Sequence, residues 1–109
     1  MAGHRLPKNP EAPATNVCIY RVKKGKEAEF RALLDKHYPT LLKAGLATKE
    51  PAKWWKTEDR KERAVYVEVF TWVSAFAPDT AHKTPAVMQV WEPMGALCED
   101  MEFLMQSDD

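Results

Sequence analysis

Residues 63–73 read RAVYVEVFTWV and alternate with a period of two, which predicts a β-strand. One predicted face is β-branched and consists of Val65, Val67, Val69, Thr71 and Val73. The other face carries three rings and one acid, namely Tyr66, Glu68, Phe70 and Trp72. We expect the β-branched face to pack beneath helices. Three large rings in a row are unusual on a wet surface, so we expect the aromatic face to meet the sheet of a second copy.

A strand and a helix are predicted on the N-terminal side of this stretch. Residues 17–22, VCIYRV, are β-branched and aromatic and stop at a KKG turn, which is typical of a strand. Residues 26–44 carry apolar side chains at spacings of three and four, which is the helical period, and Gly45 follows as a C′ residue. Pro39 falls inside this helix and Pro93 inside a later one; because proline lacks an N–H, we expect a kink or a split at each.

The remaining segments predict a hairpin, two helices and a last strand. Residues 53–56, KWWK, predict a short strand, and the charged residues 58–62 predict the turn that leads into residues 63–73. A short helix is expected from about Ser74, and a second helix from Pro85 to about Cys98, with Thr84 as its N-cap and a strand over residues 101–105 after it. This order is the split βαβ, or ferredoxin-like, pattern of an α+β domain.

The composition fits one small domain and excludes several classes of protein. The chain has 109 residues, with 16 basic and 16 acidic side chains, which is not the basic footprint of a nucleic-acid binder. No segment has the basic amphipathic face that binds a membrane surface. Residues 1–15 are rich in proline and poor in large apolar side chains, which predicts a flexible tail, or an arm that orders only on a partner, before a single domain over residues 16–109.

Cysteine use and hydropathy predict a cytoplasmic protein. Cys18 and Cys98 form no CxxC pair and are too few for a disulfide-stapled secreted domain, so we interpret them as buried thiols in a reducing compartment. No apolar run is long enough to span a membrane, and the N-terminus lacks the apolar region of a signal peptide.

Several segments resemble one known family. Residues 20–30, YRVKKGKEAEF, resemble the strand–turn–helix opening of the dimeric α/β-barrel superfamily, and the closest branch is the antibiotic-biosynthesis-monooxygenase-like group. Its uncharacterised bacterial members are resembled by three further segments: residues 38–46 (YPTL with GL), 68–72 (EVFTW) and 81–92 (AH, PAV and WE). The resemblance implies a four-stranded antiparallel sheet with helices on one face, a homodimer through the other face, and a pocket between sheet and helices.

The resemblance implies no single chemistry, because fold does not fix function. Some members oxygenate aromatic polyketides without metal or flavin, some degrade haem, and others have no assigned reaction. The haem-degrading members share an Asn–Trp–His set. Here Asn16 only precedes the predicted first strand, which disfavours haem, although His82 stays a candidate ligand. We therefore expect no cofactor, and a small aromatic or apolar ligand.

Glu68 and His82 are the candidate catalytic residues. If Glu68 is buried among rings, it is either a general base or half of a structural ion pair, for which Arg21 is the candidate partner. The remaining alternative is an exposed residue on the rim of the barrel. His82 ends the short helix, where it is a base, a hydrogen-bond donor or a metal ligand, or else a surface or capping histidine.

The candidate ligand-binding residues are mostly aromatic: Tyr66, Phe70, Trp72, His37, Trp91 and Arg21. His37 lies on the apolar stripe of the first long helix, where a core role competes with a ligand role. The four tryptophans, Trp54, Trp55, Trp72 and Trp91, would line a cavity or else fill the core and a dimer contact.

No metal-ligand spacing, phosphate loop or nucleophile motif is present in the sequence. Three hypotheses follow: a cofactor-independent monooxygenase or related enzyme, a non-catalytic ligand-binding or stress-related module, and a structural subunit. The enzyme hypothesis predicts that His82 and Glu68 point into one cavity. The binding module predicts apolar walls, and the structural subunit predicts no ligand-sized cavity.

Overall fold

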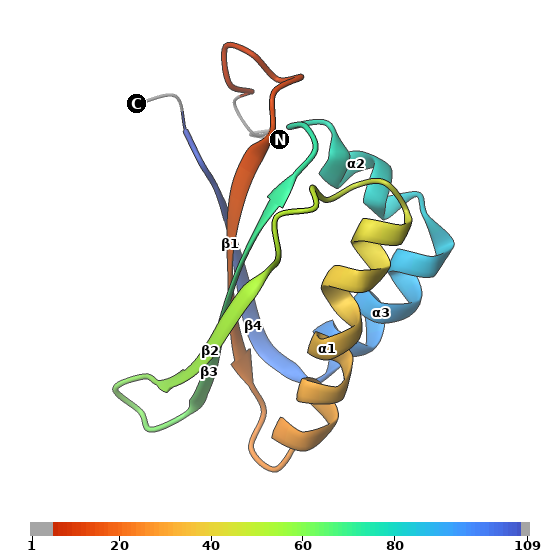
Figure 1. The fold of residues 1–109 in the computed structure, drawn as a ribbon. Coiled ribbons are helices and arrows are strands. Elements are labelled where there is room, and N and C mark those ends of the chain that lie inside the picture. Colours follow the sequence, from red (N-terminus) through yellow and green to blue (C-terminus); the bar gives the residue numbers. More distant parts are fainter. Residues whose placement is uncertain (1–5, 108–109) are drawn as a thin grey trace.

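Seven elements make up the fold in a computed structural model, which describes residues 6–107 (Figure 1). Residues 1–5 of the predicted tail and the last two residues lie outside the described part of the chain. The elements are β1 (Ala14–Val22), α1 (Glu27–Lys43), β2 (Lys53–Glu58), β3 (Ala64–Trp72), α2 (Ala77–His82), α3 (Pro85–Ala96) and β4 (Cys98–Met105).

The four strands form one antiparallel sheet in the order β2-β3-β1-β4. All three helices cover the same face of this sheet (Figure 1). The predicted ferredoxin-like α+β fold is therefore confirmed, as are the KWWK strand and the charged turn after it. In that turn Asp59 Oδ1 accepts hydrogen bonds from the amides of Lys61 (2.8 Å) and Arg63 (3.0 Å).

The predicted sidedness of β3 is wrong. The aromatic face lies beneath the helices: Tyr66 and Glu68 are each 1% exposed, and Phe70 and Trp72 are equally buried. The valine face, with Val67 and Val69 half-buried, is the outer surface of the sheet. The physical reason is that large rings bury more area against the helices than valines do. Alternation separates two faces, but it does not say which of them the helices cover.

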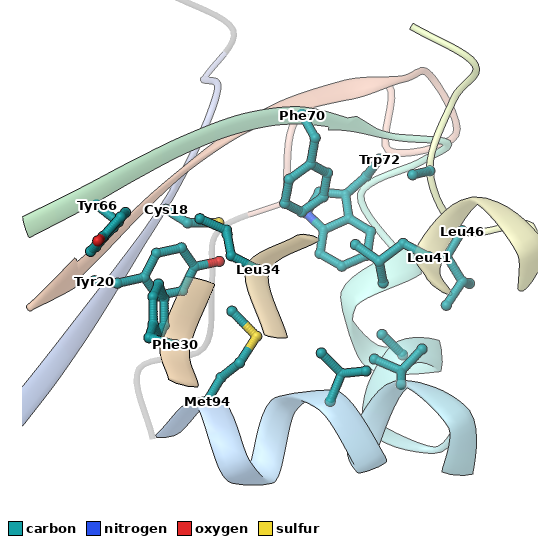
Figure 2. Packing of buried hydrophobic residues seen from close by; sticks show 14 of the residues in the cluster. Cys18, Tyr20, Phe30, Leu34, Leu41, Leu46, Tyr66, Phe70, Trp72 and Met94 are labelled. Atoms are coloured by element: carbon teal, nitrogen blue, oxygen red, sulfur yellow. The ribbon is translucent and has the colours of Figure 1, made fainter. Parts of the chain in front are cut away.

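Two aromatic groups fill the layer between sheet and helices (Figure 2). At one end, the Phe30 ring packs against Tyr20 at 5.0 Å and Tyr66 at 5.3 Å between centroids. At the other end, Phe70 and Trp72 meet edge to face at 4.9 Å, beside Leu41 and Leu46 (Figure 2). The site described below lies against the second group.

The long helices run through their prolines without a break. α1 is helical across Pro39, with the buried residues Phe30, Leu34, His37 and Leu41 on one stripe and Gly45 in the left-handed conformation (φ 77°) just beyond its end. α3 is likewise continuous across Pro93. The predicted alternative of a split helix is therefore wrong at both positions.

Several boundaries differ from the prediction. β1 begins at Ala14, so it contains Asn16. α2 begins at Ala77 rather than near Ser74. Cys98 was expected on the last helix and instead begins β4. Thr84 sits at the N-cap of α3, but its hydroxyl donates to the Thr80 carbonyl (2.8 Å) and does not cap the helix.

The segment before β1 is packed onto the domain within the described residues. The Ala75 amide donates to the Pro10 carbonyl at 2.8 Å. Across residues 6–107, none of the helices has the length and apolar character needed to cross a bilayer.

Candidate active site

A cavity of about 660 Å³ opens between the inner face of the sheet and helices α2 and α3. This volume is typical of small-molecule sites. Its walls are mostly apolar, and five sulfur-bearing side chains contribute to them: Cys18, Met88, Met94, Met101 and Met105. Methionine adapts its shape to a ligand, so these walls suit a flat apolar molecule.

Five of the eight predicted site residues line this cavity: His37, Phe70, Trp72, His82 and Trp91. They come from α1, β3, α2 and α3, and the ferredoxin-like topology brings them together. Glu68, Tyr66 and Arg21 do not line it. The requirement that Glu68 and His82 share one cavity is therefore not met.

Glu68 instead lies behind the cavity wall, at the centre of a buried hydrogen-bond chain. Its Oε1 atom accepts a hydrogen bond from the Tyr20 hydroxyl (2.8 Å) and lies 2.8 Å from His37 Nδ1. The indole Nε1 of Trp91 donates to His37 Nε2 at 2.7 Å. The side chains of Glu68 and His37 are 1% and 3% exposed, so this pair is shielded from water.

The hydrogen-bond partners of His37 determine which of its ring nitrogens carries the proton. An indole N–H can only donate, so His37 Nε2 must present a lone pair. The ring proton is then on Nδ1 and points at Glu68 Oε1, and the ring is neutral. A carboxylate that holds one histidine tautomer in this way is the arrangement that makes the opposite ring nitrogen a base.

Two further titratable groups of the wall, Cys18 and Tyr20, are held neutral. Burial, followed by the nearby Glu68 carboxylate, raises the pKa of the Cys18 thiol to about 12. Burial also raises the pKa of Tyr20 well above its usual value, with Cys18 and Glu68 adding to the effect. Neither side chain can serve as an anion near neutral pH, so neither is a candidate base.

Trp72, a residue of the cavity wall, carries a buried donor without a described partner. Its indole Nε1 is buried and has no hydrogen-bond partner among the described residues. A buried polar group without a partner costs roughly 1–3 kcal/mol, which a ligand carbonyl or oxyanion would recover. The wall therefore contains an indole N–H with no described partner among mostly apolar side chains.

His82 and Trp91 stand at the mouth of the cavity. Their rings meet edge to face at 4.9 Å, and His82 itself is exposed. Phe103 of β4, which is 50% exposed, lies on the rim. The charged groups of the described lining are the carboxylates of Asp79 and Glu92, and no lysine or arginine belongs to it.

Arg21 and Tyr66 have other partners. Arg21 pairs with Asp100 (3.0 Å) and Glu102 (2.6 Å) of β4, so the expected pairing with Glu68 is wrong. The Tyr66 hydroxyl donates to Glu27 at 3.3 Å. Both residues belong to the sheet but lie outside the cavity wall. Trp54 packs against Tyr66 and Trp55 is exposed, so neither lines the cavity.

Sequence reasoning missed Tyr20 and Asn16. Alternation placed Cys18 and Tyr20 on one face of the first strand, and that signal would have extended to Asn16 if the strand had been started earlier. Asn16 is buried, lines the cavity and donates from Nδ2 to Cys18 Sγ at 3.2 Å. The argument against haem from the position of Asn16 is therefore wrong.

The charge of the lining nevertheless does not fit haem. Two haem propionates need cationic partners, whereas the described lining offers the carboxylates of Asp79 and Glu92. Both nitrogens of His37 are already bonded, so His82 is the remaining candidate histidine ligand of the described lining. Separately, within the described residues no cluster of three or more His, Cys, Asp or Glu side chains could hold a metal ion.

Fold and cavity together define a ferredoxin-like α+β protein with a ligand-sized, mostly apolar site. No model of a known protein family matches the sequence, and no curated protein sequence matches it. Solved structures do match, and the fold is that of antibiotic biosynthesis monooxygenases. One such monooxygenase has a TM-score of 0.66 and 12% identity, covering 88% of this chain and 98% of that chain.

Two further solved structures share this fold but belong to differently named proteins. SnoaB, a cofactor-independent oxygenase from Streptomyces nogalater, has a TM-score of 0.67 and 17% identity, covering 90% of this chain and 94% of its own. A hydroxynitrile lyase from Passiflora edulis has a TM-score of 0.67 and 15% identity, covering 92% and 96%. The shared fold therefore serves more than one reaction.

Proposed function

We propose that the chain is a cofactor-independent monooxygenase, or a closely related enzyme, that acts on a small aromatic molecule with an ionisable hydroxyl or enol. The observation that supports this most strongly is the Glu68–His37 pair, because His37 lines a mostly apolar cavity and Glu68 accepts from its Nδ1, which makes Nε2 the basic nitrogen. The cofactor-independent oxygenase among the structural neighbours is consistent with this chemistry.

The proposed reaction begins with proton transfer. His37 Nε2 takes the proton of the enol, and the Glu68 carboxylate stabilises the imidazolium that forms. Trp72 Nε1 donates to the developing oxyanion. The electron-rich anion then reacts with dioxygen. For a cyclic ketone with an activated methylene, one oxygen atom becomes a new carbonyl, and the other leaves as water with the two methylene hydrogens.

In this proposal Glu68 is a positioning residue, because it acts through His37. His82 has a second proposed role at the mouth, where an exposed imidazole can pass the proton to solvent. We therefore propose His37, positioned by Glu68, as the base. The sequence had suggested His82 and Glu68 for this role.

We also propose that two copies pair through the outer face of the sheet. Val17, Ile19, Val67 and Val69 are half-buried there, and Leu104 is 52% exposed beside them. An apolar face of this kind on a small domain is typical of a protein–protein contact.

The test is oxygen consumption with anthrone, an enolisable three-ring ketone. We expect one O₂ consumed per anthraquinone formed, with one oxygen from ¹⁸O₂ in the product. His37→Gln should lower kcat by about 10²-fold or more. The matched control Gln89→Ala, on the exposed side of α3, should keep wild-type activity. Failure of the wild type to accelerate the oxidation of anthrone and of related phenols would contradict the proposal.

One observation favours a second candidate, a non-catalytic ligand-binding module. Both nitrogens of His37 are occupied and Glu68 is shielded from the cavity, so the buried chain also reads as a structural network. Tight binding of aromatic ligands without turnover, and with no effect of His37→Gln on their affinity, would support this candidate.

A further inference from the structure

Trp91 blocks His37 Nε2, the atom that the proposed reaction needs as its base. Its indole N–H is 2.7 Å from His37 Nε2, and a hydrogen bond of this length takes up the lone pair. Since Nδ1 is bonded to Glu68, no free nitrogen remains on the His37 ring. A substrate hydroxyl can reach Nε2 only if the indole N–H gives way.

The position of Trp91 allows its side chain to move away from His37. It is half-buried on α3, lines the cavity, and makes edge-to-face contacts with His82 (4.9 Å) and Trp72 (6.3 Å). Its indole nitrogen has one hydrogen-bond partner, which is His37. The contacts with His82 and Trp72 hold the Trp91 ring by packing alone. His37 and Glu68, in contrast, are held by buried hydrogen bonds.

We infer that Trp91 is a specificity-determining residue. Its indole N–H forms a cap on His37 Nε2, and only a ligand that supplies a hydrogen-bond donor of its own displaces this cap. The inference rests on the proposed function, because it concerns the same base. A phenol or enol that displaces the indole keeps Nε2 hydrogen-bonded, and the N–H of the half-buried Trp91 can then bond to water, so the exchange costs little. A hydrocarbon or an aryl ether has no such donor and leaves the cap in place.

The probes are 2-naphthol and its ether 2-methoxynaphthalene, which share the ring system and differ in the donor. In ¹H–¹⁵N spectra, the Trp91 indole resonance is assigned by its loss in Trp91→Phe. In the free protein we expect this N–H to be shifted downfield and protected from exchange by its short hydrogen bond. Saturation with 2-naphthol should remove both properties, and saturation with the ether should leave them unchanged.

Affinity gives an independent test. Trp91→Phe keeps a ring on α3 but cannot donate, so 2-naphthol no longer competes with the indole. We expect its affinity for 2-naphthol to rise roughly 2- to 10-fold, the equivalent of one hydrogen bond. The affinity of 2-methoxynaphthalene should change far less. The matched control Trp55→Phe, at an exposed tryptophan of β2 outside the cavity, should bind both probes as the wild type does.

The outcomes separate this inference from the proposed function. An indole resonance unchanged at saturating 2-naphthol, or a Trp91→Phe variant with the wild-type preference, overturns the cap. Absence of binding to both wild type and Trp91→Phe overturns the cap and the proposed function together. Displacement of the indole by 2-naphthol without oxidation of anthrone supports the cap and contradicts the proposed function.

Discussion

The indole N–H of Trp91 donates to His37 Nε2, and this one contact determines where the proton of a buried histidine lies. His37 then donates from Nδ1 to Glu68, which also accepts from Tyr20. A carboxylate, an imidazole and two ring donors are thereby joined from β1 through β3 and α1 to α3. The same chain ties the sheet to both long helices.

Removing the acceptor at the centre of this chain should destabilise the fold. Glu68→Leu leaves the Tyr20 hydroxyl and the His37 N–H buried without a partner, and we expect the free energy of unfolding to fall by about 2–4 kcal/mol. Urea denaturation measures this. Glu58→Gln, at an exposed carboxylate on β2, should change it by less than about 0.5 kcal/mol.

A second substitution makes the test specific to hydrogen bonding. In the Glu68→Leu background, Tyr20→Phe removes a donor that has already lost its acceptor. Its cost should therefore be smaller than in the wild type, because replacing both partners by apolar groups is nearly neutral. Equal costs in the two backgrounds would show that the Tyr20–Glu68 bond contributes nothing.

The Cys18 thiol should make the protein sensitive to alkali. Its pKa is raised from 9.0 to about 12, so above pH 9 the unfolded chain releases a proton that the folded chain keeps. The folded state then binds more protons, and stability falls as pH rises between these two values. We expect Cys18→Ala to lose roughly 1–2 kcal/mol less stability than the wild type between about pH 8 and about pH 10.5.

Chemical denaturation at the two pH values measures this difference. The comparison uses the change with pH, so any uniform cost of the Cys18→Ala substitution cancels. Parallel loss of stability in both proteins would mean that Cys18 ionises in the folded state as readily as in the unfolded one.

The free donor of Trp72 should select ligands with an acceptor. Trp72→Phe removes a buried N–H that has no described partner, so the free protein should lose little stability from hydrogen bonding. We expect binding of 1-tetralone to weaken by about 0.5–1.5 kcal/mol in this variant. Calorimetry with tetralin, which lacks the carbonyl, provides the matched control, and equal losses for both ligands would count against the hydrogen bond.

The proposed dimer can be tested on the valine face. Val67→Lys puts a charge at the centre of the outer sheet surface, and we expect sedimentation equilibrium to give the mass of one 12.5 kDa chain for the variant and of two for the wild type. Ala32→Lys, on the exposed side of α1, should leave the dimer intact. A monomeric wild type would refute the proposed pairing.

The order of elements could be predicted from the sequence because each element carries its own local signal. The alternation from Val65 to Trp72 and the apolar stripe from Phe30 to Leu41 both produced the structures that they predict. The inner face of β3 was assigned wrongly because both of its faces are apolar. Alternation alone does not distinguish a ring face under helices from a ring face under another sheet.

The site could be predicted only in part, because its contacts depend on register and packing. Phe70, Trp72 and Trp91 were recognised by residue type, although the face assigned to Phe70 and Trp72 was wrong. The His37–Glu68 and Trp91–His37 contacts join residues 31 and 54 positions apart, and local pattern carries no information on such pairs. Tyr20 meets Glu68 because Cys18 is the strand partner of Glu68, a register that the sequence does not display.

The most direct test of this account is the protonation of the His37 ring in the free protein near neutral pH. Long-range ¹H–¹⁵N correlation of the imidazole distinguishes its two nitrogens. We predict a protonated Nδ1 and an unprotonated Nε2, with Glu68→Leu altering the Nδ1 signal. A proton on Nε2, in either the other neutral tautomer or the imidazolium, would contradict the account.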